Sequence, residues 1–119
     1  MAPEVAMCRP YGKKCDIYSF GIFLWELSSL ETPFDGYDIE KHGERVVRNN
    51  ERPKLYSGWP ALVRDVIKGC WSANVDMRPN FDWICSTLRN EINAQDNEIF
   101  YRTKLSHERI SFKSRRNLR

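Results

Sequence analysis

The side chains best suited to acid–base chemistry near neutral pH are His42 and His107, and neither belongs to a catalytic arrangement. His42 lies among charged residues, which is typical of a solvated surface histidine. No cluster of an acid, a base and a nucleophile replaces it. The six glycines include no G-x-G, a spacing that loops use to surround phosphate groups. The residue types and their spacing therefore predict no catalytic, cofactor-binding or metal-binding residues in this chain.

The cysteines indicate a reduced protein. They are scattered and form no C-x-x-C pair of the kind that binds zinc or acts in redox exchange: Cys8, Cys15, Cys70 and Cys85. The first residues are too polar for a signal sequence, and the most apolar stretch, 17–30, is shorter than the ~20 residues that span a membrane. We therefore expect free thiols, no transmembrane segment and a cytoplasmic location.

The positive charge is concentrated at the C-terminal end. Of the 119 residues, 1–93 hold twelve Lys/Arg and thirteen Asp/Glu, whereas 94–119 hold seven basic and three acidic residues. A basic run of this kind can contact an anionic surface, and the alternative is a solvated, flexible tail. We expect a globular domain over 1–93, a basic and flexible tail over 94–119, and no binding to nucleic acid.

Hydrophobic spacing predicts an all-α fold of four helices and no strand. A helix over 16–30 is apolar on every face, which predicts that it is central and buried all round. A polar helix follows from residue 38 or 39 to about Arg48. A third helix covers 60–70, with Pro60 in its first turn. A fourth begins near Pro79 and loses its periodicity after Glu91, with a predicted buried face of Phe81, Ile84, Cys85, Leu88 and Ile92.

Four short motifs occur in a fixed order along the chain. They are Met1-Ala2-Pro3-Glu4, the segment 16–21 with sequence DIYSFG, Cys70-Trp71, and Arg78-Pro79-Asn80-Phe81. This order resembles the C-terminal part of the large lobe of a protein kinase domain, where A-P-E, D-x-x-S-F-G, C-W and R-P-x-F recur at similar separations. The tyrosine-kinase and tyrosine-kinase-like groups are the most similar, and the resemblance covers residues 1–91.

The resemblance implies structural roles for Glu4 and Arg78. In the family, the glutamate of A-P-E pairs with the arginine of R-P, because a planar guanidinium matches a carboxylate with two parallel hydrogen bonds. The alternative for Glu4 is an exposed carboxylate near the N-terminus, where an ion pair contributes little.

Three further motif positions are expected to be structural. Asp16 holds the catalytic loop in the family, a segment these residues do not include, so helix capping is the role we expect here. Gly21 lies on one apolar face of the central helix. Trp71 resembles the tryptophan that packs between the last helices of the lobe. We expect core packing for all four tryptophans, Trp25, Trp59, Trp71 and Trp83.

The parts of a kinase that bind ATP and Mg²⁺ are missing from these residues. Neither histidine is followed by Arg-Asp, and Phe34-Asp35-Gly36 is not Asp-Phe-Gly. A complete kinase domain would use ATP and Mg²⁺, whereas this chain alone is expected to bind neither and to be inactive. In the family a methionine commonly precedes A-P-E, so we expect Met1 to be internal to a longer reading frame, or the chain to be one half of a split gene.

Three functions remain open at this stage. The chain is either the C-terminal fragment of an enzyme that phosphorylates Ser, Thr or Tyr hydroxyls, a non-catalytic docking module, or a non-functional truncated product. Its expected partners are a protein substrate or the missing kinase segment. The sequences of 2–5 and 24–27 resemble those of the tyrosine-kinase-like Ser/Thr group and favour that group.

Overall fold

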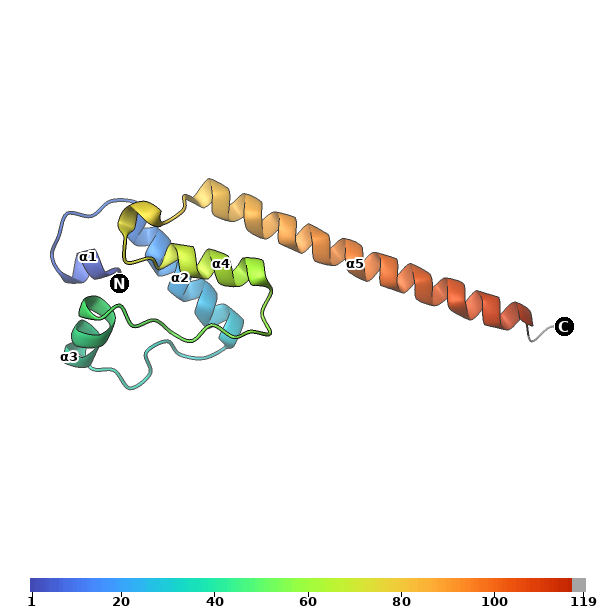
Figure 1. Cartoon of the computed structure of the whole chain (residues 1–119), viewed down its shortest axis with the longest axis horizontal. Helices are drawn as coiled ribbons and strands as arrows, with labels where there is room; N and C mark the ends of the chain where they lie inside the picture. The colour runs from blue at the N-terminus through green and yellow to red at the C-terminus, as the bar shows by residue number, and fades with distance from the viewer. Residues whose placement is uncertain (117–119) are drawn as a thin grey trace. The chain divides into compact units, whose positions relative to one another are not determined.

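The computed structural model describes residues 1–116, and these residues are helical with no strand. The elements are α1 (Pro3–Ala6), α2 (Lys14–Ser29), α3 (Ile39–His42), the π-helix η1 (Gly43–Arg48), α4 (Ala61–Cys70), the 3₁₀-helix η2 (Val75–Met77) and α5 (Phe81–Arg116) (Figure 1). The predicted all-α class is therefore confirmed. Packing divides the chain into two compact units, Met1–Cys85 and Ser86–Arg119.

The core of the first unit forms where α2 packs against α4, and these helices lie side by side (Figure 1). The buried side chains at this contact are large and mostly aromatic: Tyr18, Trp25, Ile67 and Trp71, joined by Ala2. The Trp25 indole also donates a hydrogen bond of 2.7 Å to the carbonyl of Lys54. That bond ties the 50–59 segment to the core.

The prediction that α2 is buried all round is wrong. Its buried residues form one face, whereas Phe23, Leu27 and Leu30 are 57%, 59% and 88% exposed. The spacing of these three residues, i, i+4 and i+7, places them together on another face. We call them the exposed α2 face. Sequence composition shows that a face is apolar, but only the presence of a partner decides whether it is buried.

Asp16 does not cap α2, which corrects the capping prediction. The helix begins two residues earlier, at Lys14, and the residue at its N-cap is Lys13. The backbone N–H of Asp16 already donates to the Lys13 carbonyl within a turn. At the other end, Leu30 adopts φ of 58° and its N–H donates to the carbonyl of Glu26, which stops the helix before Pro33.

The second predicted helix is present but changes its winding. The Asp38 carboxylate caps α3 by accepting from the N–H of Lys41 at 2.7 Å. From Gly43 the chain continues as a π-helix, and the Asn49 N–H donates to Glu44, five residues earlier. This wider winding buries two adjacent side chains, Val46 and Val47.

The third helix is one residue shorter than predicted, because Pro60 is its N-cap rather than part of its first turn. The buried residues of α4 are Val66, Ile67 and Cys70, and Leu62 and Val63 are partly buried. The predicted apolar face is therefore the face that packs, with the deepest burial in its second half.

The fourth helix is much longer than predicted. Hydrophobic periodicity stops at Glu91, yet α5 continues to Arg116, so 94–116 are helical rather than an irregular tail. Only Ile84 of the predicted buried face is buried; Leu88 is partly buried, and Phe81, Cys85 and Ile92 are exposed. Residues 117–119 of the predicted tail lie outside the described residues. The predicted boundary after residue 93 stays a prediction.

Candidate functional site

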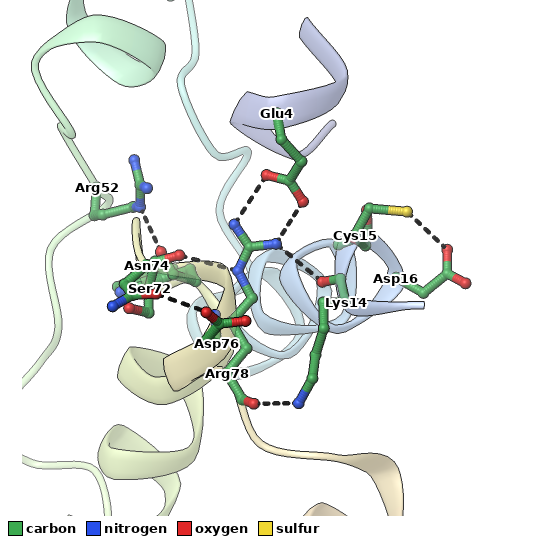
Figure 2. Close-up of polar contacts among 11 residues, drawn as sticks. Glu4, Lys14, Cys15, Asp16, Arg52, Ser72, Asn74, Asp76 and Arg78 are labelled. Carbon is green, nitrogen blue, oxygen red and sulfur yellow. Dashed lines mark hydrogen bonds and ion pairs between the residues drawn. The ribbon is translucent and has the colours of Figure 1, made fainter. Parts of the chain in front are cut away.

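Glu4 and Arg78 form a buried ion pair with two parallel hydrogen bonds (Figure 2). Nη1 of Arg78 donates to Oε1 of Glu4 at 2.7 Å, and Nη2 donates to Oε2 at 3.0 Å. Glu4 comes from α1 and is 7% exposed; Arg78 follows η2 and is 2% exposed. This is the fork-to-fork geometry in which an arginine best satisfies a buried carboxylate.

The remaining donors of Arg78 reach two other segments. Its Nε donates 2.9 Å to the carbonyl of Ser72, and Nη1 also donates 3.0 Å to the carbonyl of Lys14 (Figure 2). Lys14 in turn donates from Nζ to the carbonyl of Arg78. One guanidinium thus joins α1, the start of α2 and the loop that follows α4.

The same pair fixes the charge state of Glu4. Hydrogen bonding by the Arg78 guanidinium lowers the pKa of the Glu4 carboxyl below its ordinary value, and this effect exceeds the opposing effect of burial. Glu4 is therefore a carboxylate at neutral pH, and each of its two oxygens accepts a hydrogen bond from Arg78. This arrangement is that of a buried structural ion pair.

Two arginines lie close to the ring of Tyr18. The guanidinium carbons of Arg52 and Arg78 are each 5.1 Å from the centre of its ring. Arg52 is held by the carbonyls of Trp71 at 3.0 Å and Val46 at 3.1 Å. The Tyr18 hydroxyl is buried without a hydrogen-bond partner among the described residues, and burial raises its pKa. Tyr18 therefore contributes to this network through the contacts of its ring with the two guanidinium groups.

Sequence reasoning missed Tyr18 and Arg52 as members of this network. Arg52 lies in a segment with no periodicity, where no local signal distinguishes a buried arginine from a solvated one. Tyr18 lies one position from Ile17 in an apolar run, so its spacing alone indicates ordinary packing.

Gly21 allows α2 and α4 to approach closely. A Cβ added to Gly21 would lie 2.6 Å from the Cβ of Cys70 and 3.4 Å from the backbone of Ile67 and of Trp71. Any other residue would force the two helices apart. Burial raises the pKa of the Cys70 thiol to about 11, so it is protonated at neutral pH and acts as a small apolar group.

The structure places the other motif residues differently. Trp71 is buried in the core at the end of α4, and its carbonyl accepts the bond from Arg52. Asp16 is exposed, and the contact drawn for it in Figure 2 is a weak one from Cys15 Sγ at 3.9 Å. Glu4, Gly21, Trp71 and Arg78 therefore meet in one packed region, whereas Asp16 points away from it.

The four tryptophans do not all pack in the core, which corrects another prediction. Trp25 and Trp71 are buried, and Trp59 is partly buried against the ring of Tyr56. Trp83 is 49% exposed. Trp83 lies on α5, where most residues of the predicted apolar face are exposed.

His42 is partly buried rather than fully solvated. Its ring meets Phe34 edge-on at 5.3 Å, and burial lowers its pKa. It borders an open groove of about 630 Å³ between α1 and the α3–η1 segment, whose walls include Met7, Ile39 and Val47. Over residues 1–116, no three acidic, histidine or cysteine side chains gather as they would around a metal ion.

Residues 1–88 match the sequence model of the family described as protein tyrosine and serine/threonine kinase. This match covers most of the chain, so the chain belongs to the protein kinase family. The resemblance that the four motifs indicate is confirmed. The helices of the first unit are accordingly part of a kinase large lobe.

Three characterised kinases illustrate the similarity. The serine/threonine/tyrosine-protein kinase HT1 of Arabidopsis thaliana is 42% identical over 88 residues, which are 74% of this chain and 23% of that protein. The dual specificity protein kinase shkD of Dictyostelium discoideum is 40% identical over 77% of this chain and 12% of its own length. The mitogen-activated protein kinase kinase kinase 7 of Drosophila melanogaster is 35% identical over 74% and 13%. The chain thus spans less than a quarter of each relative.

Across residues 1–116, no helix is both long and apolar enough to cross a bilayer.

Proposed function

We propose that this chain supplies the C-terminal part of the large lobe of an enzyme that transfers the γ-phosphoryl group of ATP to Ser, Thr or Tyr hydroxyls of proteins. The observation that carries the proposal is the buried Glu4–Arg78 pair, with bonds of 2.7 and 3.0 Å. It joins the A-P-E segment to the R-P segment, and the family match includes both residues. The fold that the family uses to support its catalytic segments is thereby maintained.

Catalysis in this proposal depends on residues beyond these 119. Phosphoryl transfer needs a loop over the phosphates, a lysine, an acidic residue that orients the nucleophile, and ligands for Mg²⁺. The H-R-D, D-F-G and G-x-G sequences that provide them do not occur here. ATP and Mg²⁺ would be held by other segments of a complete domain. The chain alone is therefore inactive in this proposal.

Its cytoplasmic location also stays a prediction, supported by four free cysteines.

Titration of the purified 119-residue chain with Mg·ATP in a calorimeter tests the inactivity directly. We expect no heat of specific binding and no phosphate incorporation into a generic protein substrate. The matched control is the kinase domain of HT1 under the same conditions, which should bind and react. Saturable binding of Mg·ATP to the chain at micromolar concentrations would overturn the proposal.

The groove beside α1 favours a second function, docking of a protein partner without catalysis. It is wide enough for several side chains, and Ile39 on its wall is 94% exposed. Met1 and Met7, which also line the groove, are 69% and 38% exposed, and a contiguous exposed apolar patch of this kind is typical of an interaction site. The partner would be a protein that an active kinase of this family phosphorylates.

Competition tests this second function. An active chimera can be made by joining this chain to the HT1 sequence that precedes the matched segment. If the free chain docks the substrate, adding it in excess raises the KM of the chimera for a protein substrate. Ile39→Asp in the free chain should abolish the effect, whereas Leu30→Asp, which is equally exposed but outside the groove, should not. An unchanged KM in the presence of the wild-type chain would rule docking out.

A further inference from the structure

The second unit carries a basic helical surface that the kinase proposal does not use. Residues 99–116 of α5 are all exposed. They contain six Lys/Arg and one acidic residue, Glu108. The positive charge of the chain is therefore concentrated on a regular helix, where each side chain has a fixed direction.

Helical spacing arranges these side chains in stripes. Tyr101, Leu105 and Phe112 are separated by four and seven residues and share one face. Basic side chains border this apolar stripe on both sides: Arg102, Arg109, Lys113 and Arg116 along one edge, and Lys104 and Arg115 along the other. We call this surface the basic–apolar face of α5.

The structure shows contact between the two kinds of side chain. The guanidinium carbon of Arg116 lies 4.9 Å from the centre of the Phe112 ring. The opposite face holds Thr103, Ser106 and Ser114 together with Ile99 and Ile110, and it holds none of the six basic residues. The two faces therefore differ in charge, whereas apolar side chains occur on both.

We infer that the basic–apolar face binds the surface of an anionic phospholipid bilayer, with the helix lying in the interface plane. A flat interface accepts an apolar stripe at its centre while lysines and arginines on both sides reach the lipid phosphates. Each basic residue close to such a surface strengthens binding about fivefold.

Two other anionic partners fit this face less well. A nucleic acid backbone would satisfy the arginines and leave Leu105 in water. A groove on an acidic protein needs apolar anchors on successive turns, and Glu108 occupies the turn between Leu105 and Phe112. A bilayer tolerates that interruption, because Glu108 lies at the edge of the stripe and can stay hydrated.

Vesicle flotation with the full 119-residue chain tests the inference, since floating vesicles separate bound protein from any aggregate that sinks. We expect the chain to float with vesicles of phosphatidylcholine containing about a third phosphatidylserine, and not with phosphatidylcholine alone. Binding should weaken as ionic strength rises, because salt screens the attraction.

Two sets of substitutions identify the face. Arg109→Gln, Lys113→Gln and Arg116→Gln together should reduce binding by about 100-fold. The control, Arg9→Gln, Lys13→Gln and Lys68→Gln, removes the same charge from exposed residues of the first unit and should leave binding unchanged. Leu105→Ser with Phe112→Ser should abolish the binding that remains at high salt.

The inference fails if neutral vesicles bind equally well, or if both triple variants lose binding equally. A competition result can also overturn the inference. It fails if an oligonucleotide or an acidic peptide displaces the chain from vesicles at a concentration below the lipid concentration at which half of the chain is bound. None of these results bears on the kinase proposal, because the substitutions that test the basic–apolar face all lie outside the matched residues 1–88, and those of the control alter only exposed side chains within them.

Discussion

At Arg78 a single buried cation binds three segments that are far apart in the sequence. Its charge is paired with the carboxylate of Glu4, and it also donates hydrogen bonds to the carbonyls of Ser72 and Lys14. Removal of one partner of such a pair strands the other in the interior and costs about 3–5 kcal/mol.

A double-mutant cycle measures this pair. We expect Arg78→Ala and Glu4→Ala each to reduce the free energy of unfolding, and the double variant to cost about 1–3 kcal/mol less than the sum. Urea unfolding of the HT1 chimera provides the measurement. The exposed Glu98–Arg102 pair is the control, and its coupling should be near zero. Additive effects of Glu4→Ala and Arg78→Ala would mean that the two side chains are not in contact.

The charge of Glu4 makes the same pair sensitive to acid. Its pKa is lowered in the folded state from an ordinary value of 4.5, chiefly by hydrogen bonds from Arg78. The stabilisation is therefore fully present above about pH 4.5 and is lost as the pH falls through the folded-state value. We expect the difference in unfolding free energy between wild type and Glu4→Gln to be constant near neutrality and to shrink in acid. A difference that does not change with pH would show that Glu4 is not ionised in the folded state.

At the scale of elements, the contact between α2 and α4 depends on the absence of a side chain at Gly21. Gly21→Ala should destabilise by about 1–3 kcal/mol through overpacking against Cys70, although alanine favours helix. Gly43→Ala is the control, because nothing lies within 4 Å of its added Cβ. It should be neutral or slightly stabilising. Equal effects of the two substitutions in thermal unfolding would show that the helices are not in close contact.

The sequence predicts these elements well where local chemistry decides them. The apolar spacing of α4, the start of a helix at residue 38 or 39 and the Glu4–Arg78 pair implied by the motifs all appear in the structure. Prediction from the sequence fails where the burial or length of an element depends on residues that are distant in the chain. The position of Trp83 could not be read from spacing, because burial depends on which surfaces are available. The length of α5 beyond Glu91 could not be read either, because its exposed residues there carry no regular apolar period. Arg52 is missed for the same reason.

At the scale of the whole molecule, the exposed α2 face leaves three large apolar side chains in water. Phe23, Leu27 and Leu30 lie on adjacent turns beside Glu26 and Glu31. A contiguous apolar surface of this kind promotes association. We expect the isolated chain to form oligomers or aggregates in light scattering after size exclusion, or to behave as a molten globule that binds a dye for exposed apolar surface. Replacement of all three residues by Gln should reduce association. A wild-type chain that is monodisperse, unfolds cooperatively and binds no dye would contradict this expectation.

The central proposal is that this chain supplies the C-terminal part of a kinase large lobe and that the catalytic residues belong to other segments of a complete domain. The most direct measurement is the phosphorylation rate of the HT1 chimera, compared with the chain alone and with the chimera carrying Arg78→Ala. We expect the chimera to transfer phosphate, the chain alone to transfer none, and Arg78→Ala to reduce the rate together with the stability of the fold. A chimera that is folded and binds Mg·ATP but transfers no phosphate would contradict it.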